Sequence, residues 1–175
     1  VQVKSSSSKG KTLVGLRFGT SMVQSGTLKD KVKNGQSAGI FVMFPLPMDK
    51  FSLIIDGGMT TYKQKDANTK KLEKLGGSAG LIYDLIDSGS FKLGLGGEIG
   101  YAKYETKNTG ANAAAGKDKS KMFAQADALG SYDFGNTMSG ILKVSYGSVS
   151  LDDLDGLNLK KSNYLGVSLG IAKAF

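Results

Sequence analysis

Three residue types are absent: the 175-residue sequence has no cysteine, no histidine and no tryptophan, and it has only two prolines. Without cysteine there can be no disulfide framework and no thiolate metal site. Without histidine the chain lacks the commonest general base and the commonest metal ligand, which excludes nucleophile–histidine pairs. We therefore expect a protein that is not an enzyme and that uses no cofactor and no metal ion.

The sequence also lacks any apolar run long enough for a transmembrane helix. It does not begin with the charged, apolar and small-residue segments of a signal peptide, so we expect such a peptide to have been removed already. The net charge is +8, which suits an acidic partner such as anionic lipid, polysaccharide or nucleic acid. Apart from Tyr62 and Tyr104, aromatic residues that could stack on bases do not interleave with the lysines, so we expect no nucleic-acid binding.

What the chain does contain is hydrophobic alternation with a period of two. In residues 164–175, Leu165, Val167, Leu169 and Ile171 share one face, and the other face is small or polar. Such alternation is typical of a strand with one apolar face. It predicts eight strands, at residues 12–23, 38–44, 51–61, 78–86, 91–102, 122–134, 138–148 and 164–175. Strands of about 9–13 residues suit a tilted crossing of a bilayer.

The connections between these strands alternate in length. Those at residues 45–50, 87–90 and 135–137 are short and contain proline, glycine or asparagine, which favour tight turns. Those at residues 24–36, 63–77, 103–121 and 151–162 are long and polar. Short turns on one rim and long loops on the other are typical of outer-membrane barrels. The predicted fold is all-β: an eight-stranded, antiparallel, up-and-down transmembrane β-barrel with a polar interior over residues 12–175, after a flexible tail at residues 1–11.

The positions of the phenylalanines support the assignment of the short turns to one rim of the barrel. Five phenylalanines lie beside a short turn or at the end of the sequence, each on the apolar face of its strand: Phe44, Phe51, Phe91, Phe134 and Phe175. In a folded barrel they would form a ring at the short-turn rim, as an interfacial aromatic girdle requires.

Charged residues on the opposite strand faces are expected inside the barrel. Counted from the short turns, they fall roughly 13–18 Å up the barrel, with Asp84 somewhat lower. The expected interior network is Arg17, Asp56, Asp84, Glu98, Asp127 and Lys143. Arg17 is predicted to lie among Asp56, Glu98 and Asp127, because a guanidinium can bind two carboxylates. We favour a polar core that fills a narrow barrel over an ion path.

Lysines gather in the predicted long loops. They are Lys29, Lys31 and Lys33; Lys70, Lys71 and Lys74; and Lys117, Lys119 and Lys121. The simplest interpretation is that these lysines only keep the rim soluble. The more specific hypothesis is that they contact anionic lipid or acidic host molecules.

Together, the eight alternating strands, the alternating loop lengths, the inward Arg17, Glu98, Asp127 and Lys143, and the terminal Phe175 resemble the small eight-stranded outer-membrane proteins: the OmpA transmembrane domain, OmpX, Ail and opacity-type proteins. Lys173, two residues before the end, and the lack of tryptophan depart from their pattern. The resemblance implies a bacterial outer-membrane location and a role in envelope integrity, adhesion, serum resistance or small ion conductance.

Our main hypothesis is a monomeric, non-enzymatic outer-membrane barrel, structural or adhesin-like. Its partners would be outer-membrane lipid and, at the loops, lipopolysaccharide or acidic host molecules. The first alternative is a narrow porin-like channel for ions or small solutes. The second is a soluble ligand-binding barrel of the lipocalin type, in which the apolar strand faces would point inward, since alternation alone does not say which face is outside.

Overall fold

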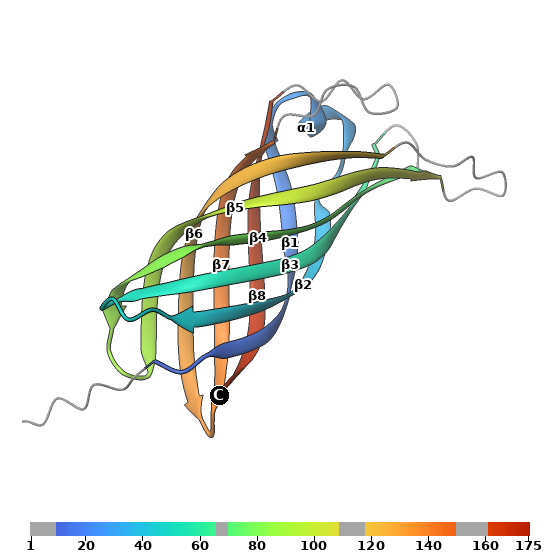
Figure 1. Ribbon diagram of the computed structural model, residues 1–175. Coiled ribbons are helices and arrows are strands. Elements are labelled where there is room, and N and C mark those ends of the chain that lie inside the picture. The colour runs from blue at the N-terminus through green and yellow to red at the C-terminus, as the bar shows by residue number, and fades with distance from the viewer. Residues whose placement is uncertain (1–9, 66–69, 109–117, 150–160) are drawn as a thin grey trace, which may run out of the picture.

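The computed structural model describes residues 10–65, 70–108, 118–149 and 161–175, so most of the predicted tail at residues 1–11 lies outside the described residues. The chain forms a closed β-barrel in which every strand pairs antiparallel with its sequence neighbours (Figure 1). The elements in chain order are β1 (Leu13–Ser25), α1 (Thr27–Lys31), β2 (Gly35–Pro45), β3 (Phe51–Lys63), β4 (Lys70–Asp87), β5 (Phe91–Asn108), β6 (Asp118–Gly135), β7 (Met138–Val149) and β8 (Ser162–Ala174).

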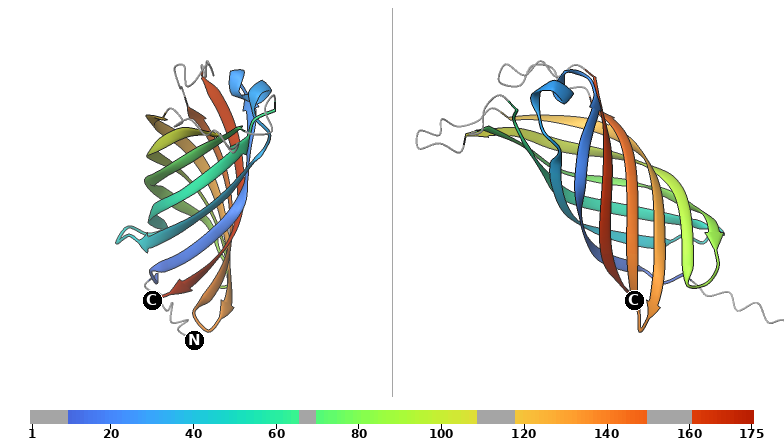
Figure 2. Two further views of the ribbon diagram at one scale, coloured as in Figure 1. Left: turned by 90° about the vertical axis from the view of Figure 1, so that its right-hand side faces the viewer. Right: turned by 180° about the vertical axis from the view of Figure 1, so that it is seen from behind.

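The barrel closes between its first and last strands. β8 pairs with β1 from Ala174, opposite Leu13, to Asn163, opposite Ser25, and the Phe175 amide donates to the Thr12 carbonyl at 2.9 Å. Closure leaves no strand edge exposed in the wall (Figure 2). The predicted fold is therefore confirmed.

The three short connections follow the local turn chemistry. Gly89, Gly135, Asn136 and Thr137 all have positive φ, as does Lys50 before β3. Asn136 and Thr137 are consecutive, and two positive φ values in succession match the twist of a tight antiparallel hairpin. We call this rim the short-turn end and the opposite rim the long-loop end.

At the long-loop end the strands are longer than predicted. β4, β5 and β6 each have 18 residues, so residues 70–77, 103–108 and 118–121 belong to strands and not to loops. Hydrophobic alternation did not predict these strand ends, because lysines and glutamates occupy the outward positions here. Leu72, Tyr104 and Thr106 occupy inward positions and are buried. The hydrophobic pattern also did not predict α1, which lies in the expected loop at residues 24–36. Within the described residues, no helix has the length and apolar character needed to cross a membrane.

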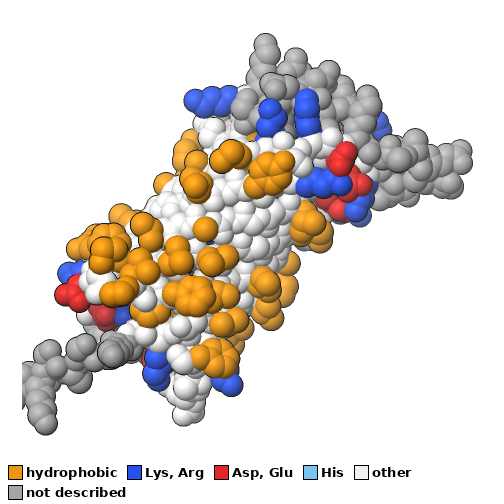
Figure 3. Space-filling view, viewed as in Figure 1, with side chains coloured by type: hydrophobic (Ala, Val, Ile, Leu, Met, Phe, Trp, Pro, Cys, Tyr) orange, Lys and Arg blue, Asp and Glu red, His pale blue; other side chains and the backbone are white. Residues whose placement is uncertain are grey.

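The outward surface of the barrel is apolar over its middle. Phe18, Ile99, Met122 and Leu169 are each at least 65% exposed, and many other outward side chains of this zone are apolar. Figure 3 shows the hydrophobic side chains spread over the body of the barrel, with charged side chains toward its two ends. We call this zone the apolar belt. Because charged residues are buried inside and apolar residues lie outside, the lipocalin-type alternative is wrong.

The five phenylalanines of the predicted aromatic ring lie near the short-turn end of the barrel. Phe44, Phe91, Phe134 and Phe175 are exposed, and Phe51 is half-buried against Tyr83, with ring centroids 5.0 Å apart. Tyr132 packs edge-on against Phe134 at 5.4 Å, and Lys173 lies 5.3 Å from the Phe175 ring. An interfacial aromatic girdle at this rim stays a prediction.

Candidate functional site

The barrel interior contains a charge cluster centred on Lys143 of β7. Its ammonium donates to Asp56 Oδ2 of β3 at 3.0 Å and to Glu98 of β5, and it lies 3.8 Å from Asp127 Oδ1 of β6. All four side chains are at most 4% exposed. A buried ammonium among three carboxylates can stabilise all of them, whereas isolated buried charges are costly.

Arg17 occupies a different place from the one predicted. Its Nε and Nη2 both donate to Asp56 Oδ1, at 3.0 and 2.5 Å, and Asp56 is its ion-pair partner among the described residues. The expectation that Arg17 lies among Asp56, Glu98 and Asp127 is therefore wrong, since Lys143 holds that position. The described contacts of the cluster do not include Asp84, which lies nearer the short-turn end, opposite Gly94.

Neutral side chains that the sequence analysis did not single out extend the cluster. Ser78 donates to Glu98 Oε2 at 2.5 Å, and Gln125 Nε2 donates to Asp127 Oδ1 at 3.1 Å. The Tyr164 hydroxyl in turn donates to Gln125 Oε1 at 3.1 Å. Within the described residues, Asp127 Oδ2 has no hydrogen-bond partner. These residues could have been predicted from the sequence, because each occupies an inward position on its strand and carries a polar group.

Glycines on the inner wall make room for these side chains. A Cβ on Gly80 would lie 2.6 Å from Glu98 Cγ, and a Cβ on Gly147 would overlap the Tyr164 ring. The glycine content of the inward faces is thus a requirement of the packing, because real Cβ atoms do not approach that closely.

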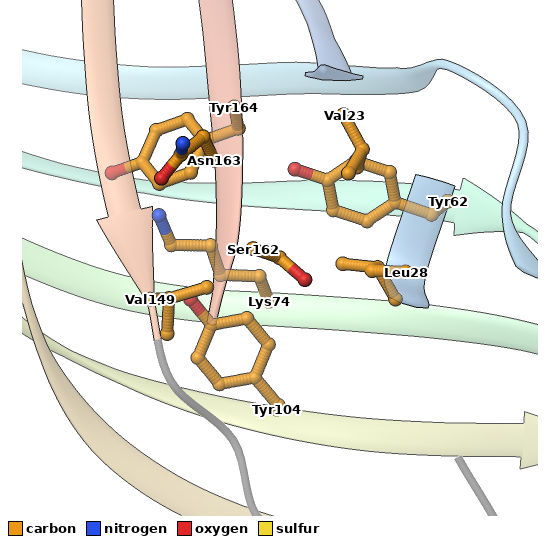
Figure 4. A pocket seen from close by; sticks show the side chains of 9 residues that line it. All are labelled: Val23, Leu28, Tyr62, Lys74, Tyr104, Val149, Ser162, Asn163 and Tyr164. Carbon is orange, nitrogen blue, oxygen red and sulfur yellow. The ribbon is translucent and has the colours of Figure 1, made fainter. Parts of the chain in front are cut away.

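Apolar layers close the interior on both sides of the cluster. Toward the short turns, Ile54, Leu129 and Ile141 each lie two residues along the strand from Asp56, Asp127 and Lys143, and they pack with Phe41 and Ile82. Toward the long loops, Leu28 and Val32 from the α1 segment pack with Tyr62, Leu72, Tyr104 and Phe123. Figure 4 shows Leu28, Lys74 and the rings of Tyr62, Tyr104 and Tyr164 in this layer. They line a cavity of about 10 Å³, the space of one water molecule.

Lys74 belongs to this interior and not to a loop. Its ammonium lies 4.0 Å from the centre of the Phe123 ring and 4.7 Å from that of Tyr164. Below it, a polar cavity of about 60 Å³ borders Arg17, Asp56 and Gln125. With Lys74, three basic side chains lie on the inner wall near the three carboxylates of the cluster. The prediction that Lys74 is a loop residue is wrong.

A second concentration of charge lies at the long-loop end, where the α1 segment docks on the end of β3. The Lys33 amide donates to the Lys63 carbonyl at 2.8 Å, and the Lys65 amide donates to the Lys31 carbonyl at 2.9 Å. Lys65 Nζ also donates to the Lys29 carbonyl at 2.8 Å. Buried Leu28 and Val32 anchor the segment from below. We call Lys29, Lys31, Lys33 and Lys65, all exposed, the basic cap.

The remaining predicted lysines are dispersed. Lys70 and Lys71 lie on β4, on opposite strand faces, and Lys119 and Lys121 of β6 share the inward side with Phe123. Lys117 lies outside the described residues. The expected loop clusters therefore divide into a basic cap, inward-facing lysines and lysines on the outer wall.

A closed, antiparallel, up-and-down barrel of eight strands is the fold of the small outer-membrane β-barrels. No protein-family model and no curated protein sequence matches the chain. Solved structures do match it, over almost the whole chain.

Three of these structures are informative. Neisserial surface protein A has a TM-score of 0.72 and 16% sequence identity, covering 94% of this chain and 97% of that one. Ail of Yersinia pestis, in complex with the heparin analogue sucrose octasulfate, has a TM-score of 0.60 and 13% identity over 95% and 99%. OprG of Pseudomonas aeruginosa has a TM-score of 0.58 and 12% identity over 95% and 97%. At these identities the likeness concerns the fold.

Proposed function

We propose that this protein is a non-enzymatic barrel of the bacterial outer membrane, adhesin-like, whose basic cap binds acidic polymers. The apolar belt and the aromatic girdle support the location, because exposed side chains of this kind are expected where lipid surrounds the wall. The similar folds are all those of outer-membrane proteins.

The observation that carries the binding proposal is the ordered basic cap. Its backbone is joined to Lys63 and Lys65 by three hydrogen bonds and is anchored by two buried apolar side chains, so the backbone positions of its lysines are fixed relative to one another. Asp30 is the acidic residue in the segment Lys29–Lys33, so positive charge prevails. That Ail binds a heparin analogue supports sulfated polysaccharide as the class of partner.

We expect heparin to bind the folded barrel weakly at low salt, and we expect the triple change Lys29→Gln, Lys33→Gln and Lys65→Gln to reduce the affinity about tenfold. Exposed charges contribute through screened attraction, which extends about 10 Å at 0.1 M salt and about 3 Å at 1 M. Isothermal titration at both salt concentrations measures the effect.

The matched control removes the same charge elsewhere, with Lys11→Gln, Lys92→Gln and Lys173→Gln at the short-turn end. This variant should bind heparin like the wild type at low salt. Binding that persists at 1 M salt, or that the cap variant retains, would rule out an electrostatic cap and point to a shaped site.

The channel alternative is tested separately. Because apolar layers lie above and below the charge cluster, we expect no steady ion conductance from the barrel in a planar bilayer. The double variant Ile54→Gly, Ile141→Gly, which thins the lower layer, serves to show that openings are detectable in the same assay. Long-lived openings of the wild-type barrel would favour the porin-like alternative.

A further inference from the structure

The α1 segment supplies the part of the apolar layer at the long-loop end that does not come from a strand (Figure 1). Its buried side chains are Leu28 and Val32, and the other members of the layer lie on strands of the wall. Leu28 and Lys74 border the same water-sized cavity, and Lys74 also borders the polar cavity beside the charge cluster. The segment therefore contributes to closing the polar interior at this end.

The folded form of this segment depends on its docking. α1 has five residues, and a single helical turn of this length is not stable in water on its own. The residue before it, Gly26, has no side chain to cap the first turn, and its φ of 87° with ψ of 175° suits glycine only. The helix is thus held by buried Leu28 and Val32 and by the hydrogen bonds to Lys63 and Lys65. Such an element has a docked and an undocked state.

Like charges face each other where the segment docks on β3. The joint is an isolated antiparallel bridge between Val32 and Gln64. On either side of this bridge a lysine is hydrogen-bonded through its backbone to another lysine: Lys33 to Lys63, and Lys65 to Lys31. Residues 29–33 and 63–65 together hold five lysines and one acidic residue, Asp30. Like charges on opposite positions of neighbouring strands are destabilising, so a bound polyanion would favour the docked state.

We propose that the α1 segment is a lid on the barrel interior and that an acidic polymer bound to the basic cap holds this lid closed. The inference rests on the proposed function of the cap and gives that binding a consequence inside the barrel. A sulfated chain that spans the joint contacts lysines of the segment and of the β3 end together, and it loses part of these contacts when the segment undocks. A ligand that binds the docked state more tightly shifts the equilibrium toward it.

Undocking can be measured with a single thiol, because the sequence has no cysteine. Val32 is 3% exposed, so an uncharged, water-soluble maleimide reaches the thiol of Val32→Cys only when the segment is undocked. We expect slow labelling, followed by mass spectrometry of the barrel folded in zwitterionic detergent. Heparin at ten times its dissociation constant should slow it about tenfold, because a ligand of the docked state lowers the undocked population by about this factor. Adding Leu28→Ala should accelerate labelling at least about tenfold, because it removes the larger anchor.

A disulfide staple tests whether undocking opens the interior. Val32 and Gln64 form a pair that is not itself hydrogen-bonded, and the Cα atoms of such antiparallel pairs lie about 4.5 Å apart, within the range for a disulfide. In Val32→Cys, Gln64→Cys, an amine-reactive reagent should label Lys74 at least about tenfold more slowly in the oxidised form than in the reduced form. Equal labelling of Lys74 in both forms would show that the segment is not a lid.

Ser120→Cys is the matched control for shielding by the polymer, because its thiol is exposed on the outward face of β6 at the same end. Heparin should change its labelling by less than about twofold. Combining Val32→Cys with Lys29→Gln, Lys33→Gln and Lys65→Gln should abolish the effect of heparin. If heparin does not bind, the proposed function of the cap fails and the inference fails with it. If heparin binds but does not slow the labelling of Val32→Cys, or if this thiol is not labelled within hours, only the lid is refuted. The mobility of unheated samples on a gel verifies that every variant is folded.

Discussion

Replacing Lys143 with methionine should lower the free energy of unfolding by about 3–5 kcal/mol, the largest effect we expect of a single substitution. Lys143 lies within ion-pair distance of Asp56, Glu98 and Asp127, and its removal leaves buried carboxylates with too little compensating charge. Urea unfolding of the barrel in lipid bilayers, followed by the gel mobility of unheated samples, measures the change.

Two control variants distinguish the contribution of Lys143 to stability from that of its neighbours in the cluster. Arg17→Met should cost clearly less, because Asp56 keeps its contact with Lys143 and because the Arg17 side chain is 22% exposed. Adding Glu98→Gln to Lys143→Met should restore part of the stability by removing one of the unpaired charges. An unchanged urea midpoint for Lys143→Met would show that the cluster does not stabilise the barrel.

The second large effect is expected on the outer wall. Leu169→Arg places a charge at the middle of β8, where the side chain is 67% exposed and its strand neighbours are Phe18 and Leu142. A buried arginine at the midplane of a bilayer costs about 2–4 kcal/mol in transmembrane barrels. We expect a loss of this size in bilayers, measured by urea unfolding.

Ser120→Arg is the matched substitution beyond the belt. Ser120 is exposed on the outward face of β6 near the long-loop end, where an arginine should cost at most about 1 kcal/mol. Equal effects of the two changes would mean that lipid does not surround the belt. A soluble barrel would tolerate both.

Particular residues show how much of the fold and of the charge cluster could be predicted from the sequence. Alternation in segments such as Leu165–Ile171 was enough to predict eight strands, because one apolar face per strand repeats at every second residue. Asp56, Glu98, Asp127 and Lys143 were predicted together, because equal counts from the short turns imply equal depth. The ends of β4, β5 and β6 were missed, because charged residues occupy outward strand positions there as readily as they occupy loops.

The amino-acid sequence by itself determined the strand number, the inward and outward faces and the short-turn end, because these depend on local periodicity and turn chemistry. Only the tertiary structure decided that Lys143 and not Arg17 lies among the three carboxylates, and that Lys74 lies inside the barrel. The physical reason is the closure of the barrel. Contacts across the lumen and between neighbouring strands depend on the stagger of every strand pair around the ring, and no single segment encodes that stagger.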